Sequence, residues 1–275
     1  MTLEIGFIGL GDQGAPMATA IAEAGFPLHV WARRPASLTA VADVPHTAHD
    51  TVAELAAAVD VAALCVSEDQ DVLGLLDGGL LAGLRPGSVV VNHGTGVPSA
   101  ATRMAELCAE HEAGFLDVPV SGGHAGAVTR TLTAMIGGPA ELADRCAPVF
   151  ASFSAHVHHL GEVGSGQLAK LFNNTLMMMN QANVEEVLAV AAALDVDLPG
   201  LVAVLKNGSA GSFTLSALGD AITAGNVEHL SRVELVDMDL FAAAMAERHA
   251  PAAAVTARAI AGAEGLVDLV RRLEK

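Results

Sequence analysis

The 275-residue chain has 31 acidic and 14 basic residues and a formal net charge of −17, which excludes nucleic acid as its main partner because such binding depends on lysine and arginine neutralising phosphates. Hydrophobic residues make up 52% of the sequence and charged residues 16%, a balance typical of a folded chain that can bury one large core or two modest ones. Charges or glycines interrupt every long apolar run before about 18 residues, and the acidity disfavours anionic membrane surfaces, so we expect no membrane partner.

The N-terminal segment MTLEIGFIGLG lacks the cationic region of a secretory signal peptide and is typical of a strand that enters a glycine turn. The cysteines Cys65, Cys108 and Cys146 lie far apart in apolar segments, which is typical of buried thiols in a reducing compartment. We therefore expect a cytoplasmic protein. The histidine-rich segment at residues 156–160, HVHHL, alternates like a strand and lacks the paired helical spacing of a zinc site.

The first predicted strand, residues 2–10, runs into a glycine-rich turn and then an alanine-rich helix that ends at Gly25. The turn has the spacing G-x-G-x-x-G, in which the first glycine permits a tight turn, the second lets a pyrophosphate approach the backbone, and the third lets helix and strand pack closely. The pattern in this context predicts dinucleotide binding, with a purely structural turn as the alternative. The predicted cofactor-binding residues here are Gly9, Leu10, Gly11, Gln13 and Gly14.

The second predicted strand, residues 27–31, is followed by Arg33 and Arg34. An enzyme selective for NAD usually offers an acidic residue here to the ribose hydroxyls, whereas arginine suits bidentate contacts with a 2′-phosphate. We therefore favour NADP(H) over NAD(H) as the cofactor. The alternative is that one or both arginines cover the adenine or face solvent.

Further strands are predicted in chain order at residues 61–66, 88–92, 114–120, 131–138 and 155–160, with helix-compatible segments between them. Buried strands that alternate with helices predict an α/β fold with a doubly wound, mainly parallel sheet. Ligands of such sheets bind where the strands end. This edge includes Val66, Ser67 and Thr95, which we expect to contact the cofactor. It also includes the segment from Ser121 to Gly123.

After residue 163 the apolar residues follow helical spacing, beginning with a long helix from about residue 167 to residue 194. The pattern predicts a first domain at residues 1–163 and an all-helical second domain at residues 164–275, with some five or six helices. Long alanine-rich faces with few charges exceed what one small domain can cover, so we expect a homodimer or homotetramer.

The segment GQLAKLFNN places Lys170 in a stretch that is otherwise apolar or amide-bearing, although the chain has only three lysines. Lys170 and Asn174 are four residues apart and therefore share a helix face near the N-terminal end of the long helix. Desolvation and the positive helix start disfavour the charged form of a lysine here, which would let it exchange a proton with a substrate oxygen. The alternative is a structural lysine whose head group reaches water past an apolar surface.

Four segments together resemble the β-hydroxyacid dehydrogenase family, which includes 3-hydroxyisobutyrate dehydrogenase and tartronate semialdehyde reductase. They are GFIGLGDQGAPMA, NHGTGVP, DVPVSGGHAGAVTRTLTAMIGG and GEVGSGQLAKLFNN, in the family's order over essentially the whole chain. The resemblance implies a Rossmann-type α/β domain followed by an all-α domain. It also implies a nicotinamide-dependent enzyme that oxidises a 3-hydroxy acid or reduces an aldehyde acid, a small-molecule substrate.

The resemblance also implies roles for individual residues. Lys170 matches the catalytic lysine that gives a proton to the carbonyl oxygen or takes it back, and Asn174 matches the asparagine that orients lysine and substrate. Thr95 matches a residue near both nicotinamide and substrate. The segment that holds the substrate carboxylate is matched by Ser121, Gly122 and Gly123.

Two departures from the family pattern bear on the substrate. Many members carry a lysine before an aspartate in a helix of the second domain, where this chain places Met238 before Asp239. Without that cation, a less acidic, bulkier or more apolar substrate is expected, with Met238 at the substrate. His124 directly follows the Ser-Gly-Gly segment and either supplies a replacement cation or is a loop histidine with no reactive contact.

Two other functions remain open on the sequence. An imine reductase of similar architecture usually lacks the lysine and uses an aspartate or tyrosine elsewhere, whereas this chain has Lys170 and no tyrosine. A dinucleotide-binding sensor that kept the fold would be marked by loss of the same lysine. The sequence does not specify the substrate or the direction of the reaction in the cell.

Overall fold

Six strands form the larger sheet, in the order β3-β2-β1-β4-β5-β6, and every neighbouring pair is parallel. The computed structural model describes residues 2–274. The predicted parallel sheet is therefore confirmed, and only the two-residue strand β3 was missed by the sequence pattern. The strands are β1 (Ile5–Ile8), β2 (Leu28–Trp31), β3 (Thr47–Ala48), β4 (Val61–Leu64), β5 (Val89–Asn92) and β6 (Gly114–Asp117).

A second, smaller sheet contains β7 (Val120–Ser121), β8 (Leu132–Ile136) and β9 (Ser154–His159), with β7 antiparallel and β9 parallel to β8. The single strand predicted at residues 114–120 is thus divided between two sheets. Pro119 stands at the division and has no N–H to donate to a strand ladder. The histidine-rich segment lies in β9, as its alternation predicted. Across residues 2–274, no group of three or more histidine, cysteine, aspartate and glutamate side chains is arranged to hold a metal ion.

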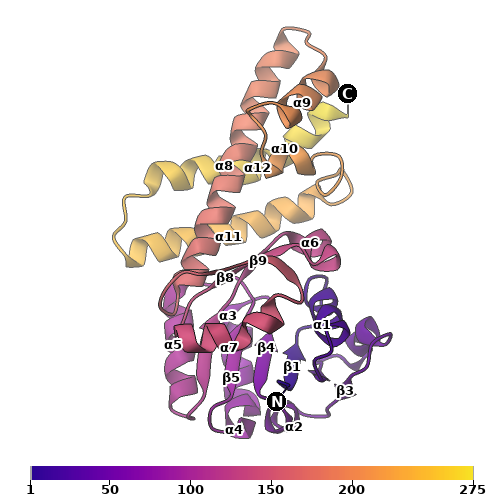
Figure 1. Ribbon diagram of the computed structural model, residues 1–275. Helices are drawn as coiled ribbons and strands as arrows, with labels where there is room; N and C mark the ends of the chain where they lie inside the picture. Colours follow the sequence, from indigo (N-terminus) through magenta and orange to yellow (C-terminus); the bar gives the residue numbers. More distant parts are fainter. Residues whose placement is uncertain (1, 275) are drawn as a thin grey trace. The chain divides into compact units, whose positions relative to one another are not determined.

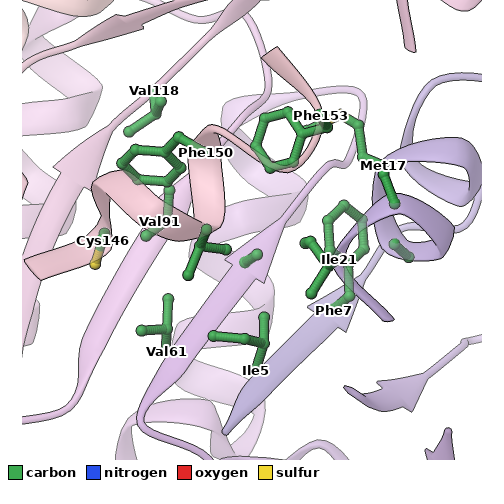
Figure 2. Close-up of a cluster of buried hydrophobic side chains, with 14 of the residues drawn as sticks. Ile5, Phe7, Met17, Ile21, Val61, Val91, Val118, Cys146, Phe150 and Phe153 are labelled. Atoms are coloured by element: carbon green, nitrogen blue, oxygen red, sulfur yellow. The ribbon is translucent and has the colours of Figure 1, made fainter. Parts of the chain in front are cut away.

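Helices cover both faces of the larger sheet (Figure 1). One core cluster joins the sheet to α1 and α7, and Figure 2 shows Ile21 of α1 near Phe7 of β1, with Phe150 of α7 near Val91 of β5. A second cluster joins the opposite face to α2, α3 and α5 through side chains such as Leu55. The helices of this half are α1 (Gly14–Glu23), the 3₁₀ helix η1 (Pro35–Val41), α2 (Val52–Ala58), α3 (Asp69–Leu75), the π-helical segment η2 (Leu76–Leu80), α4 (Leu81–Gly83), α5 (Pro98–Ala109), α6 (Gly123–Thr129) and α7 (Ala140–Phe150).

The rest of the chain is helical, which confirms the predicted order of an α/β domain and an all-α domain. It consists of α8 (Ser165–Ala193), α9 (Leu198–Asn207), α10 (Phe213–Ala217), α11 (Val227–Glu247) and α12 (Ala253–Leu273). In Figure 1, α11 and α12 cross the long helix α8. A Cβ added at Gly262 of α12 would collide with the carbonyl oxygen of Met178, so the backbones of α12 and α8 meet directly at this glycine.

The chain divides into two compact units, Met1–Lys170 and Leu171–Lys275. The division falls within α8, a few residues beyond the boundary predicted after residue 163. The first turn of α8 therefore belongs to the N-terminal unit and the remainder of the helix to the C-terminal unit. No helix among the described residues combines the length and the apolarity needed to span a bilayer.

Candidate active site

The carboxyl ends of β1, β4 and β5 meet at one edge of the sheet. Their pairing register places Ile8 beside Leu64, and Leu64 beside Asn92. The loops that follow these residues are therefore neighbours, and a Cβ at Gly94 would lie 2.7 Å from the carbonyl oxygen of Val66. The structure thus brings the glycine turn, the loop of Val66 and Ser67, and the loop of Thr95 together in the N-terminal unit.

The glycine turn has the geometry that the spacing predicted. Gly9 has a φ of +102°, and a Cβ there would collide with the carbonyl oxygen of Cys65. A Cβ at Gly14 would collide with the carbonyl oxygen of Gly9, so this glycine permits the close packing of α1 on β1. At Gly11 a Cβ would meet nothing within 4 Å. This open approach to the backbone suits a pyrophosphate, and the turn therefore fits a dinucleotide.

A hollow of about 760 Å³ lies beside the turn, between α1, η1 and α6. Its lining includes Gly11, Asp12, Arg34 and His124. The neighbouring Arg33 is directed elsewhere, because its Nη1 lies 3.4 Å from Asp71 Oδ1 and its side chain is 78% exposed. The two arginines predicted to bind a 2′-phosphate therefore have different surroundings, and of the two it is Arg34 that lines the hollow beside the glycine turn.

His124 contacts the cofactor turn. Its Nδ1 lies 2.7 Å from the carbonyl oxygen of Asp12, so the Nδ1–H donates to that oxygen and Nε2 is the remaining ring nitrogen. This bond links α6 to the glycine turn. The suggestion that His124 replaces a substrate-binding cation stays a prediction, and the contact favours a role in supporting the turn.

The turn between β7 and α6 contains the predicted carboxylate-binding segment. Ser121 ends β7, and the next two residues, Gly122 and Gly123, have φ values of +129° and +61°. Glycine adopts this left-handed region readily. The two glycines with this conformation lead directly into α6. The assignment of their backbone amides to a substrate carboxylate stays a prediction.

Two side chains hold the loop that carries Thr95. Asp69 Oδ2 accepts a hydrogen bond of 3.0 Å from the backbone N–H of Val97. From the first turn of α8, Gln167 bonds both neighbours of Thr95, namely the carbonyl oxygen of Gly94 at 2.8 Å and the N–H of Gly96 at 2.9 Å.

Asp117 holds the first turn of α8. Its Oδ1 accepts from the N–H of Gly164 at 2.7 Å, and its Oδ2 accepts from the N–H of Gln167 at 2.8 Å. The carboxylate therefore satisfies free amides at a helix start, where negative charge is favourable. Burial raises the pKa of Asp117 to about 6, while the backbone donors act in the opposite direction.

Lys170 lies half-buried on α8, one turn after Gln167. Asn174 follows one turn later and is the first of the predicted residues in the C-terminal unit. Its Nδ2 donates to Asp237 Oδ2 at 2.7 Å, and its Oδ1 accepts from Asn173 Nδ2 at 3.0 Å. These bonds fix which end of the Asn174 amide faces Asp237.

Met238 is buried in the C-terminal unit, with 1% of its surface exposed. Its sulfur lies 3.9 Å from Thr175 Oγ1, so it packs against α8 within that unit. Its assignment to the substrate stays a prediction. On the preceding turn of α11, Glu234 Oε1 accepts from Gln181 Nε2 at 2.7 Å, and burial raises the pKa of Glu234 to about 7.

Four polar residues near this site were missed by sequence reasoning, although two of them left a signal. Asp117 is a carboxylate inside an otherwise apolar predicted strand, and Gln167 is the polar residue at the start of a long helix. Both are fully buried, and such placements indicate a structural partner. Asp69 and His93 left no comparable signal. The buried His93 donates from Nδ1 to the carbonyl oxygen of Val118 at 2.9 Å, and burial lowers its pKa to about 4.

Comparisons with known proteins agree with this geometry. A family model described as the NAD binding domain of 6-phosphogluconate dehydrogenase matches residues 4–161. A second, described as NAD-binding of NADP-dependent 3-hydroxyisobutyrate dehydrogenase, matches residues 164–272.

Individual relatives and structures point the same way. The chain is 34% identical over 214 residues to the NAD-dependent L-serine dehydrogenase of Pseudomonas aeruginosa, covering 77% of this chain and 72% of that protein. It is 33% identical over 215 residues to the 3-hydroxyisobutyrate dehydrogenase of the same organism, covering 78% and 72%. The solved 3-hydroxyisobutyrate dehydrogenase of Mycobacterium tuberculosis with L-serine has the same fold, with a TM-score of 0.85 at 23% identity over 100% of both chains. The chain therefore belongs to the β-hydroxyacid dehydrogenase family.

Proposed function

We propose that this NAD(P)-dependent dehydrogenase interconverts a 3-hydroxy acid and the corresponding aldehyde acid, with Lys170 as the general acid and base. The observation that carries the proposal is the placement of Lys170. It lies one helical turn after Gln167, and the Gln167 side chain bonds the loop at the end of β5. That loop is at the edge of the sheet where the dinucleotide turn also lies.

A nicotinamide bound at this edge would supply or accept the hydride. In the reducing direction, the Lys170 ammonium donates a proton to the substrate oxygen, and in the oxidising direction the neutral amine accepts it. Asn174, on the same face of α8, orients the reacting oxygen. The Ser121 hydroxyl and the amides of Gly122 and Gly123 hold the substrate carboxylate.

Between NADP(H) and NAD(H), we favour NADP(H) as the cofactor. Arg34 lines the hollow beside the glycine turn, and a guanidinium there can form a bidentate contact with a 2′-phosphate. Arg33 supports this choice less, because it is largely exposed and pairs with Asp71.

We further propose a cytoplasmic homo-oligomer. The predicted reducing location is supported by Cys108 and Cys146, which are free and buried. Self-association is supported by large apolar side chains exposed in the C-terminal unit, including Val190 on α8 and Leu194 directly after this helix.

The test of the reaction is a screen of aldehyde acids, 3-hydroxy acids and simple carbonyl compounds with NADPH and NADH, following cofactor absorbance. Lys170→Ala should lower kcat by about 10²–10⁴-fold, which is the usual contribution of a positioned proton donor, and should still bind NADPH. Lys206→Ala is the matched control, since Lys206 bonds the carbonyl oxygen of Leu218 in the C-terminal unit.

Full activity in Lys170→Ala would rule out the assigned role. Binding of NADPH without turnover of any hydroxy or aldehyde acid would instead favour the imine reductase first, and then the sensor.

A further inference from the structure

The side-chain amide of Gln167 bonds the backbone on both sides of Thr95. Nε2 donates to the carbonyl oxygen of Gly94 at 2.8 Å, and Oε1 accepts from the N–H of Gly96 at 2.9 Å. The side chain is 1% exposed, so water does not compete for these bonds. The pair is specific to glutamine, because the site requires one donor and one acceptor at the end of a two-carbon stem.

The loop cannot shift away from Gln167, because Asp69 holds it from another side. Asp69 Oδ2 accepts from the N–H of Val97, and a Cβ at Gly96 would collide with the Asp69 carboxylate. Thr95 therefore stands in a short loop with polar restraints on both sides. Such restraints fix the position of a side chain more closely than packing alone.

The helical turn that carries Gln167 is itself fixed. The backbone N–H of Gln167 donates to Asp117 Oδ2 at 2.8 Å. A Cβ at Gly166 would lie 2.6 Å from the carbonyl oxygen of Asp117, so the start of α8 presses directly on the backbone where β6 ends. Sliding or rotation of this turn would break these contacts.

We propose that Gln167 is a positioning residue for the reaction, which fixes the turn carrying Lys170 at a set distance from the loop carrying Thr95. The inference rests on the proposed role of Lys170. Gln167 does not touch substrate or exchange a proton. Its function is to hold the proton donor and the nicotinamide-side loop in one arrangement, and a displacement of about 1 Å in such an arrangement costs on the order of 10²-fold in rate.

The test is Gln167→Met, which keeps the length of the side chain and removes both hydrogen bonds. We expect kcat to fall by about 10²-fold, while the Kd for NADPH changes by less than about threefold, because the glycine turn is untouched. Gln181→Met is the matched control. Gln181 is an equally buried glutamine on α8 whose amide bonds Glu234. This variant should lose thermal stability and keep its kcat.

A double variant separates positioning from general destabilisation. If Gln167 acts through Lys170, then Gln167→Met should lower kcat much less in the Lys170→Ala background than in the wild-type chain. If Gln167→Met lowers Tm as Gln181→Met does but leaves kcat unchanged, the positioning role is overturned. If the proposed role of Lys170 is itself wrong, the result is different, because Lys170→Ala would then keep full activity.

Gln167→Glu provides a second variant if Gln167→Met does not fold. It keeps the shape of the side chain and the acceptor for the N–H of Gly96, and it places an oxygen against the carbonyl of Gly94. At pH 8 we expect kcat to fall by at least about tenfold, since the hydrogen bond from the Gln167 amide to the carbonyl oxygen of Gly94 is replaced by repulsion between a carboxylate oxygen and that carbonyl oxygen. Wild-type kcat in this variant would also overturn the proposal.

Discussion

At the scale of single residues, Arg33 and Arg34 are adjacent in sequence but differ in their surroundings. Arg34 lines the hollow beside the glycine turn, whereas Arg33 extends towards Asp71. Arg34→Ala should therefore weaken binding of NADPH by about 10–100-fold, as expected for one charge-assisted contact to a phosphate. Binding of NADH should change little, because NADH lacks the 2′-phosphate.

Fluorescence titration of both cofactors checks this prediction, with Arg33→Ala and Arg103→Ala as controls. Arg103 pairs with Glu106 on the exposed side of α5, and its loss should leave both affinities unchanged. Equal weakening of NADPH and NADH in Arg34→Ala, or a larger effect in Arg33→Ala, would contradict the assignment of the phosphate to Arg34.

Residue positions differ in how far the sequence could predict them. The roles of Gly9, Gly11 and Gly14 follow from spacing, because each acts within a few residues of its neighbours. The role of Gln167 depends on partners 71 and 73 residues away. His124 is a similar case, since its partner Asp12 is 112 residues distant and no local pattern reports that pairing.

At the scale of elements, α8 and α11 share a buried polar pair within the C-terminal unit. Glu234 Oε1 accepts from Gln181 Nε2, while Glu234 Oε2 and Gln181 Oε1 have no hydrogen-bond partner among the described residues. Burial raises the pKa of Glu234 from its ordinary 4.5 to about 7, the Gln181 bond lowers it, and the charge of Asp237 raises it further. The protonated, neutral form of Glu234 is therefore the more favourable form in the folded protein.

The sign of the pH dependence follows. Because the folded-state pKa is raised, the contribution of Glu234 to stability is fully present below pH 4.5 and is lost as the pH rises through about 7. Glu234→Gln keeps the shape, replaces the unpartnered oxygen with a donor, and removes the titration. We expect it to stabilise the protein at pH 8 by on the order of 3 kcal/mol.

Denaturant unfolding at pH 5 and pH 8 measures this effect. The stability difference between Glu234→Gln and the wild-type chain should be small at pH 5 and large at pH 8. A difference that does not change between the two values would show that Glu234 does not titrate in this range.

Elements were predictable where their pattern is continuous. The long helix predicted from residue 167 to residue 194 is Ser165–Ala193 in the structure, because its apolar spacing is uninterrupted. The segment at residues 114–120 was predicted as one strand because it is apolar apart from Asp117. It divides at Pro119, which cannot donate to a strand ladder, beside a tertiary pairing of Asp117 with Gly137 that local sequence does not encode.

At the scale of the whole molecule, the C-terminal unit exposes several large apolar side chains. Leu194 is 71% exposed and Val190 is 62% exposed. We expect sedimentation at micromolar concentration to give a dimer or tetramer. The double variant Val190→Glu and Leu194→Glu should shift the distribution towards monomer if this face is an interface, whereas Val128→Glu, at an exposed valine of α6, should not. A wild-type monomer would refute the prediction.

The order of the two domains was predictable at this scale because strand and helix periodicities separate cleanly along the chain. The number of subunits was not, since exposed apolar side chains can be identified only after the buried ones are known.

The boundary between the two units falls within α8, and this position determines where domains could be exchanged between members of the family. The Asp117 carboxylate is fully buried and accepts hydrogen bonds from Gly164 and Gln167, both of which lie beyond the end of the sequence-defined first domain. A fragment that stopped at residue 163 would leave that buried acid without these donors. A working chimaera would therefore keep residues 164–170 with the N-terminal unit and join its new partner in the middle of a helix, where register as well as sequence must match.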